Sequence, residues 1–359
     1  MRKKKLTIDA RMIDDSGIGT YLKNLLPFLL LDFDIVLLGN KEKLYRYSKL
    51  NNCQIIEFNA EIYSLKEQLL FPFKVPKTDV FWAPHFNTPI LPVKAKKRIT
   101  TIHDVNHLSA ISTISVLKKK YSKILYLNAI KRSRIVITVS NFSKKEIVKY
   151  TNVNPDKIKV IYCGVSDRFK TYKTLKIPLP KKYILFVGNV KPHKNLKVLL
   201  EAYSSLNKEL QSTYKLVVLG KKSGFITSDK SVFKYIEKEN ITSAVFFTDY
   251  IKDEFVSSIY KNAQLLVFPS LYEGFGLPLI EAMTVGTPVL SSNSASLPEI
   301  GGTSAIYFNP TNVKELTTKI ELLLTNKALQ KTYIEKGIEH VKKFSWEKSA
   351  KEHINLINN

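Results

Sequence analysis

The sequence predicts an α/β protein built from two doubly wound domains, each a parallel β-sheet covered by helices. Short runs of β-branched and aliphatic residues alternate with amphipathic helical stretches along the chain. The 359 residues exceed what one hydrophobic core normally serves. Residues 166–182, rich in lysine and proline and without periodicity, separate the two halves as a linker. We therefore expect two domains facing each other across a cleft, with ligands beyond the carboxyl ends of the strands.

The first domain is expected over residues 1–165. The run LKNLLPFLLLDFDIVLL contains Pro27 and two aspartates and is shorter than a membrane span, so it predicts a helix followed by a strand. Ser143 and Glu146 have the spacing of a capping box, which predicts that a helix opens at Ser143. The expected strands are KKLTIDA, DIVLLG, DVFWAP, RITTIHD, RIVITVS and KIKVIYCGV.

The second domain is expected over residues 183–343, where the same alternation begins again. In the stretch PSLYEGFGLPLIEAMTVGTP, a glycine-rich turn leads into a short helix that should start at Pro278 and end before Gly286. A last helix is expected over residues 344–359, from about Ser345. The expected strands are YILFVG, KLVVLG, AVFFTDYI, QLLVFPS and TPVLSS.

The net charge of +25 is concentrated in the first half of the chain. Residues 1–180 contain 33 Lys and Arg against 14 Asp and Glu, giving +19. An anionic membrane attracts such residues by about 1 kcal/mol each, and nucleic acid attracts them without sequence preference. Because no nucleic-acid module is recognisable, we expect a membrane surface or an anionic lipid acceptor; a solvated lysine-rich face is the alternative. The basic clusters are Lys94–Arg98, Lys118–Lys123 and Lys131–Arg134.

Cysteine usage and the N-terminal residues indicate where the protein works. Cys53 and Cys163 are too few for a disulfide framework, so a reducing compartment fits best. The basic start MRKKKLTIDA lacks the apolar run of a signal peptide. No His or Cys cluster has metal-ligand spacing. We therefore expect a cytoplasmic protein, peripheral on the inner face of the cytoplasmic membrane, that needs neither metal nor cofactor.

Two carboxylates flank the glycine-rich turn of the second domain. Backbone amides at the start of a short helix, here those of Phe275, Gly276 and Leu277, make an anion site that phosphate commonly occupies. Glu273 and Glu281 beside such a site suit a ligand that carries hydroxyls next to its phosphates, as a nucleotide-sugar does. Taken singly, each glutamate is equally compatible with a solvated helix or turn residue.

Other candidate groups stand where strands end. The strand YILFVG ends at Gly188 and leads through Lys191 to Lys194, just before a helix; Lys194 is the expected diphosphate contact, unless it is a solvated loop lysine. His103 follows the strand RITTI, where it can bond a sugar hydroxyl, move a proton or serve structure alone. Gly17 can let the backbone approach a ligand. Weaker candidates of the histidine kind are His85 and His107.

With these motifs in view, the chain resembles the family 4 glycosyltransferases, retaining enzymes of the GT-B fold. The resemblance covers most of the length and is closest to bacterial mannosyl- and rhamnosyltransferases that build surface polysaccharides, including lipopolysaccharide. The motifs that carry it are PSLYEGFGLPLIEAM, VGNVKPHKNL, SLPEIGG, FSWEKSA, TVSNFSKKEI, TIHDV and DARMIDDSGIGTYL.

The resemblance implies a role for each candidate residue. Glu281 would hold the ribose, Glu273 the transferred sugar, Lys194 the diphosphate, and His103 would lie beside the reaction centre. The helix containing Trp346 would cross back to the first domain, and Glu299 would line a second loop of the cleft. The catalytic residues would be Glu273, Lys194 and His103, and the substrate-binding residues Gly17, Gly188, Asn189, Tyr250, Ile251, Gly274, Phe275, Gly276, Leu277 and Glu281.

The expected activity is a retaining, metal-independent transfer of a hexose from a nucleotide diphosphate-sugar, with GDP-mannose as the expected donor, to a hydroxyl of a lipid-linked saccharide. The nucleotide-sugar is a substrate, not a cofactor. The alternatives are another nucleotide-sugar enzyme, such as a hydrolysing epimerase, and a membrane-associated binding subunit without turnover. Asn189 stands where many family members have arginine, so Lys191 is the candidate replacement, and Asp249 stands where glycine is common.

Overall fold

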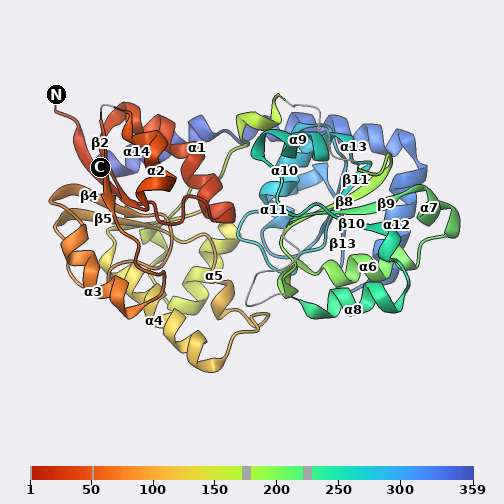
Figure 1. Cartoon of the computed structure of the whole chain (residues 1–359), viewed down its shortest axis with the longest axis horizontal. Helices are drawn as coiled ribbons and strands as arrows, with labels where there is room; N and C mark the ends of the chain where they lie inside the picture. The colour runs from red at the N-terminus through yellow and green to blue at the C-terminus, as the bar shows by residue number, and fades with distance from the viewer. Residues whose placement is uncertain (1, 51, 172–178, 221–228) are drawn as a thin grey trace. The chain divides into compact units, whose positions relative to one another are not determined.

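The computed structural model describes residues 2–50, 52–171, 179–220 and 229–359. The chain divides into two compact units. The first consists of Met1–Gly164 with Ser345–Asn359, and the second of Val165–Phe344. Each unit contains its own parallel sheet with helices on both faces, as the sequence predicts (Figure 1).

In the described residues, the first unit has a seven-stranded parallel sheet in the order β3-β2-β1-β4-β5-β6-β7. The order reverses between β1 and β4, where the chain turns from building one edge to building the other. In such a sheet the loops at the carboxyl ends of the strands on either side of the reversal form the usual ligand crevice. The strands are β1 (Lys4–Asp9), β2 (Phe33–Gly39), β3 (Cys53–Glu57), β4 (Thr78–Ala83), β5 (Ala95–Thr101), β6 (Ile135–Thr138) and β7 (Ile158–Val160).

The helices of the first unit cover opposite faces of this sheet (Figure 1). Right-handed crossovers place helices that lead toward β3 on one face and helices that lead toward β7 on the other. The first face carries α1 (Ser16–Asp32), α2 (Lys41–Ser48) and α14 (Trp346–Asn358), and the second carries α3 (Leu65–Lys74), α4 (Val116–Arg132) and α5 (Asn141–Thr151).

The second unit has a six-stranded parallel sheet in the order β10-β9-β8-β11-β12-β13 among the described residues. Its strands are β8 (Tyr183–Val187), β9 (Lys215–Leu219), β10 (Val245–Phe247), β11 (Leu265–Phe268), β12 (Val289–Ser292) and β13 (Ile306–Phe308). Its helices are α6 (Leu196–Ser204), α7 (Lys208–Thr213), α8 (Lys230–Lys238), α9 (Asp253–Asn262), α10 (Leu277–Thr284), α11 (Leu297–Gly301), α12 (Val313–Thr325) and α13 (Lys327–His340).

The predicted strands are all present, and the structure adds two that the sequence pattern did not reveal. Both, β3 and β13, lie at sheet edges. An edge strand is partly exposed and needs no continuous apolar run, so its sequence carries a weak signal. The run LKNLLPFLLLDFDIVLL forms the end of α1 and β2, as expected. None of the helices in the described part of the chain is both long and apolar enough to reach across a bilayer.

Two predicted helix starts differ from the structure. The helix expected to open at Ser143 begins at Asn141, because Ser140 is the capping residue: its hydroxyl accepts the Ser143 N–H at 3.0 Å. The Ser143 hydroxyl instead donates to the His103 carbonyl at 2.8 Å. The helix expected to start at Pro278 begins one residue earlier, at Leu277.

The segment expected to link the domains contains a short 3₁₀ helix, Asp167–Phe169. The Phe169 side chain is buried in the core of the second unit, packing edge-on against Tyr260. Residues 172–178 of the expected linker lie outside the described residues.

The last helix, α14, belongs to the first unit. Trp346 at its start packs edge-on against Tyr21 of α1, with ring centroids 5.8 Å apart. His353 is fully buried, and its Nδ1–H donates to the Ser349 carbonyl at 2.7 Å while Nε2 accepts the Tyr21 hydroxyl. Burial lowers the pKa of His353 to about 4, so the ring is neutral in the folded protein at pH 7.

This buried histidine predicts a pH dependence of stability. The unfolded chain takes up a proton near pH 6.5, whereas the folded protein resists it until about pH 4. Stability is therefore present above pH 6.5 and is lost as the pH falls, by about 3 kcal/mol in total. Urea unfolding at pH 7 and pH 4 should show a smaller loss for His353→Gln than for the wild type. An unchanged pH dependence in this variant would contradict the assignment.

Candidate functional site

The glycine-rich turn of the second unit connects β11 to α10. Gly276 precedes the helix with φ of 106°, a left-handed conformation that side chains with a Cβ rarely adopt. A Cβ at this position would lie 2.7 Å from Cδ2 of Leu297. Glycine is therefore required here both by the backbone conformation and by the close approach of α11. The turn holds the predicted residues Gly274, Phe275 and Leu277 at the start of the helix.

The loop after β8 is fastened to the loop after β11. Asn195, in the left-handed conformation before α6, donates through its side-chain amide to the carbonyls of Pro269 at 3.1 Å and Pro310 at 2.8 Å. The Leu271 N–H donates to the His193 carbonyl at 2.8 Å. These bonds fix the relative positions of the two loops on which the predicted phosphate and sugar contacts lie.

Lys194 and Glu273 meet across these two loops. Nζ of Lys194 lies 2.6 Å from Oε1 of Glu273 and 5.5 Å from the centre of the Phe268 ring. The two side chains are only 20% and 14% exposed, so the pair is shielded from solvent without being sealed off. Gly188, another predicted residue, lies beside the stem of Lys194: a Cβ there would be 3.4 Å from Cδ of the lysine.

The side chain of Ser296 contacts the backbone of the glycine-rich turn. Its buried hydroxyl lies 2.9 Å from the carbonyl of Glu273 and 2.9 Å from that of Phe275, and it can donate to either. The serine directly precedes α11, whose first residue packs against Gly276. This residue shapes the turn although sequence reasoning gave it no role. Its only signal was its place as the first residue of the motif SLPEIGG.

Glu281 points to a different set of partners. The Tyr260 hydroxyl donates to its Oε2 at 2.6 Å, and Nη2 of Arg168 lies 3.8 Å from its Oε1. Burial raises the pKa of Glu281, while the guanidinium of Arg168 and the Tyr260 hydroxyl oppose that shift. Arg168 also pairs with Asp253 at 2.9 Å. Sequence reasoning missed Arg168 because it lies in the segment interpreted as a linker.

The predicted substrate-binding residues Tyr250 and Ile251 lie in the segment that follows β10. Asp249 has φ of 51°, Tyr250 is 76% exposed and Ile251 is buried in the core of the unit. Because the side chain of Ile251 is packed inward, its backbone is the part that a ligand can reach. The remaining predicted position, Asn189, lies in the loop after β8.

The other predicted residues belong to the first unit. His103 follows β5 and donates from Nε2 to the Pro84 carbonyl at 2.9 Å, which leaves Nδ1 as an acceptor. Burial lowers the pKa of His103, so the ring is neutral at pH 7. Gly17 lies in the first turn of α1, where a Cβ would meet nothing within 4 Å. At Gly19, by contrast, the backbone packs closely: a Cβ there would lie 2.3 Å from the Ile13 carbonyl oxygen.

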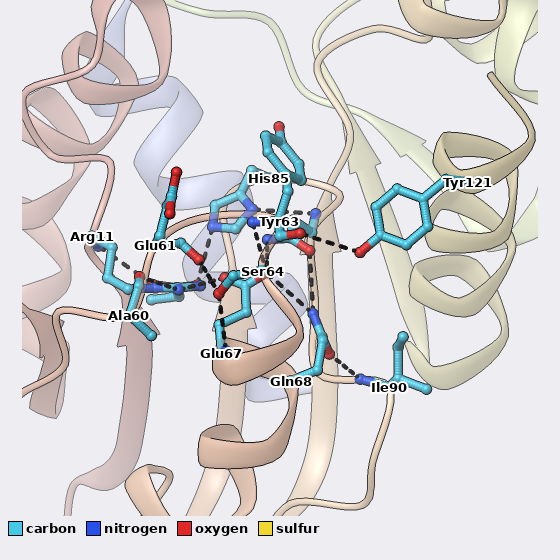
Figure 2. Close-up of polar contacts among 12 residues, drawn as sticks. Arg11, Ala60, Glu61, Tyr63, Ser64, Glu67, Gln68, His85, Ile90 and Tyr121 are labelled. Carbon is cyan, nitrogen blue, oxygen red and sulfur yellow. Dashed lines mark hydrogen bonds and ion pairs between the residues drawn. The ribbon is translucent and has the colours of Figure 1, made fainter. Parts of the chain in front are cut away.

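A buried ionic network lies at the carboxyl ends of β1 and β4 (Figure 2). Arg11 pairs with Asp9 at 2.7 Å and with Glu67 at 2.6 Å, and the Arg11 side chain is only 4% exposed. His85 accepts the Asn87 N–H at Nδ1, 3.2 Å away, and donates from Nε2 to Asp9 at 3.0 Å. Sequence reasoning ranked His85 as a weak candidate and missed the other members.

The charges of this network are stabilised by one another. Burial alone would raise the pKa of Asp9, but Arg11 and His85 outweigh it and hold the pKa well below its usual range. The Arg11 guanidinium also lies over the rings of Phe58 and Phe71, 4.5 and 4.7 Å from their centres. Asp9 is thus an ionised acid whose counter-ion, Arg11, is enclosed with it.

Two family models match consecutive parts of the chain. "Glycosyltransferase Family 4" matches residues 51–169, and "Glycosyl transferases group 1" matches residues 167–340. The chain belongs to these glycosyltransferases. Both loops that carry the Lys194–Glu273 pair lie inside the group 1 match.

Two curated relatives from Escherichia coli and one solved structure define the similarity further. O-antigen chain mannosyltransferase B is 28% identical over 78% of this chain and 74% of its own length. The serotype-specific mannosyltransferase WbdA is 31% identical over 63% of this chain, but the match spans only 29% of WbdA. The sucrose-phosphate synthase of Thermosynechococcus elongatus has a TM-score of 0.80 at 18% identity, over 99% of this chain and 98% of that one. The glycosyltransferase thus has the GT-B fold.

The structure brings some predicted residues of this glycosyltransferase together. Lys194 contacts Glu273 directly, and Gly188 and Gly276 lie beside the same loops. Glu281 contacts Tyr260 and Arg168 instead. No group of three or more His, Cys, Asp or Glu side chains within the described ranges is arranged to hold a metal ion.

Proposed function

We propose that the protein transfers mannose from a nucleotide diphosphate-sugar to a hydroxyl of a lipid-linked saccharide acceptor, with retention of configuration and without a metal ion. The observation that carries the proposal is the Lys194–Glu273 pair beside the glycine-supported start of α10. The choice of mannose rests on the names of the relatives, O-antigen chain mannosyltransferase B and WbdA. GDP-mannose is the proposed donor.

The chemistry of the pair suits such a donor. When the donor binds, its diphosphate can accept from Lys194 and the hydroxyls of its sugar can donate to Glu273. These contacts replace the ion pair between Lys194 and Glu273. The anomeric C–O bond breaks, and the electron pair leaves with the diphosphate. The acceptor oxygen bonds to the anomeric carbon on the same face, and its proton passes to an oxygen of the leaving phosphate. Lys194 stabilises the charge that grows on that group.

Glu281 is the proposed ribose contact. Tyr260 occupies its Oε2, so that Oε1 is the oxygen through which it can accept from ribose hydroxyls. The neutral His103, with Nδ1 as an acceptor, is the proposed contact for a sugar hydroxyl. Gly17, where the backbone can approach a ligand, is the proposed neighbour of the donor phosphates. We place the protein in the cytoplasm, peripheral to the membrane that contains the lipid-linked acceptor.

Replacing Glu281 should mainly weaken donor binding. Glu281→Gln keeps an acceptor for Tyr260 but removes the charge, and Glu281→Ala removes both. We expect Glu281→Ala to cost about 2–3 kcal/mol of donor affinity, the strength of hydrogen bonds to one charged group, with little change in kcat. Calorimetric titration with the donor measures this loss. The matched control is Asp253→Ala, which removes the other, 70% exposed, acidic partner of Arg168. Wild-type donor affinity in Glu281→Ala would contradict the ribose assignment.

A panel of donors tests the function as a whole. GDP-, UDP- and dTDP-sugars are compared by thermal shift, because a bound donor at a hundredfold excess over its Kd stabilises by about 2.7 kcal/mol. The stabilising donor is then supplied in radiolabelled form with and without a lipid-linked saccharide. Labelled product that depends on the acceptor supports the transferase. Epimerised sugar without acceptor indicates a hydrolysing epimerase, and binding without turnover indicates a binding subunit.

A further inference from the structure

The outward face of α3 carries an apolar stripe. Leu65, Leu69 and Phe73 are 77%, 64% and 84% exposed. They are spaced four residues apart, which places them along one line of the helix. A stripe of large apolar side chains in water is costly, at about 25 cal/mol for each Å² of apolar surface that could otherwise be buried.

The helix cannot turn this stripe inward, because its other face is fixed. Glu67 is fully buried, pairs with Arg11 and accepts the Tyr63 N–H at 2.9 Å (Figure 2). The neighbouring Gln68 accepts the Ile90 N–H at 2.9 Å (Figure 2). Rotating α3 would break a buried ion pair, so the exposure of the stripe follows from how the unit is built.

The helix α4 covers the same face of the sheet as α3 (Figure 1), and it too carries exposed apolar side chains. Val116, Leu117 and Ile124 are 69%, 79% and 59% exposed, whereas Leu125 and Tyr126 face inward and are buried. Tyr121 connects the two helices: its hydroxyl lies 3.4 Å from the carbonyl of Tyr63, just before α3 (Figure 2). We call the outward residues of α3 and α4 the α3–α4 surface; its apolar members are Leu65, Leu69, Phe73, Val116, Leu117, Tyr121 and Ile124.

The exposed apolar side chains of the protein are concentrated in this region. Eleven of the nineteen large ones found among the described residues lie between residues 63 and 127. The described part of the second unit contributes four, Phe246, Tyr250, Leu322 and Ile338. Single exposed apolar residues are normal, whereas a contiguous set marks a surface that binds something apolar.

The charge of the α3–α4 surface is uniformly positive. The helix α4 contains six Lys and Arg and no Asp or Glu, and Lys118, Lys120 and Lys123 are exposed among its apolar residues. In the Lys94–Arg98 cluster, by contrast, Lys97 donates to the Leu356 carbonyl at 2.6 Å, and Arg98 donates to the Leu91 carbonyl at 2.8 Å. Lysine beside leucine and isoleucine on one helix face is the pattern of helices that lie in the interface of an anionic membrane.

We propose that the α3–α4 surface docks onto an anionic lipid bilayer, with its apolar residues in the acyl boundary and its lysines at the lipid phosphates. A second copy of the chain is a poor occupant, because a two-fold interface would bring the uncompensated lysines of two α4 helices together. Nucleic acid would leave the apolar stripe in water. The inference deepens the proposed transfer to a lipid-linked acceptor, but vesicle binding is measured without donor, so each can fail separately.

The test is co-sedimentation of the full chain with vesicles of phosphatidylcholine, alone or mixed with phosphatidylglycerol. Wild type should bind the mixed vesicles far more tightly than the neutral ones. Lys118→Gln/Lys120→Gln/Lys123→Gln should weaken that binding roughly a hundredfold. Leu69→Ser/Phe73→Ser/Leu117→Ser should abolish it at high salt, where the lysines are screened. The matched control, Tyr45→Ser/Leu322→Ser, removes exposed apolar residues of α2 and α12 and should bind as wild type does.

Two results would overturn the proposal. One is equal binding of wild type and the apolar variant. The other is a wild-type dimer in sedimentation velocity that the apolar variant converts to monomer, which would make the surface an interface between copies. Circular dichroism and donor binding of the variants, which should match wild type, show that the fold is retained. If vesicle binding follows the proposal while no donor is bound or turned over, the proposed function fails and the docking surface stands.

Discussion

Lys194→Met should lower kcat by about 10²–10³-fold, the usual effect of removing one group that stabilises charge growing in a transition state. The physical reason is the position of the ammonium, 2.6 Å from Glu273 in the loops that meet beside α10. Methionine keeps most of the side-chain volume against Phe268, so the fold should be retained. Transfer of labelled mannose at saturating donor measures the change.

The matched control for this variant is Lys197→Met, three residues further along. Lys197 pairs with Glu201 on α6 at 3.7 Å and is 48% exposed, so its loss should leave kcat unchanged. A Lys194→Met enzyme with wild-type kcat but a raised KM would show that the lysine binds the donor equally in ground and transition states. Wild-type values of both kcat and KM would show that Lys194 takes no part in donor binding or catalysis.

Arg11→Met should destabilise the first unit by about 3–5 kcal/mol, the usual cost of leaving buried charges without their partner. The variant leaves Asp9 and Glu67, both fully buried, without the guanidinium that pairs with each of them. Urea unfolding followed by a probe in the first unit measures the loss. Adding Glu67→Gln to the variant should restore part of the stability, because one of the two stranded charges is then removed.

Lys96→Met provides the comparison at the surface. Its partner Asp79 is 2.7 Å away, but the Lys96 side chain is 75% exposed, so the pair should contribute less than about 1 kcal/mol. If Arg11→Met lowers the free energy of unfolding no more than Lys96→Met does, the buried network of Arg11 does not stabilise the first unit as inferred.

Much of the fold could be predicted from the sequence because parallel strands buried on both faces are continuous apolar runs. β2 and β8 contain such runs, IVLL and YILFV, bounded by glycine or polar turns. β3 and β13 were missed because edge strands are short and half exposed. The start of α5 was misplaced because Ser140 and Ser143 are both plausible caps, and only the tertiary bond from Ser143 to the His103 carbonyl distinguishes them.

The candidate site was predictable only where its residues are close in sequence. Glu273 and Gly276 belong to one motif, and Lys194 follows a strand end. Ser296 and Arg168 come from distant segments, and nothing local in the sequence indicates the bonds they make. The network of Arg11 and Glu67 joins residues 56 positions apart, so it is visible only once β1 and α3 are packed together.

The return of the chain to the first unit has a consequence for how the protein is made. Residues 165–344 leave the ribosome before residues 345–359, so the second unit has its whole sequence available while the first still lacks α14. Until then, the α1 surface that receives Trp346 and His353 lies uncovered, with Tyr21 unable to reach its histidine. The nascent protein therefore completes its halves in the reverse of their order along the chain.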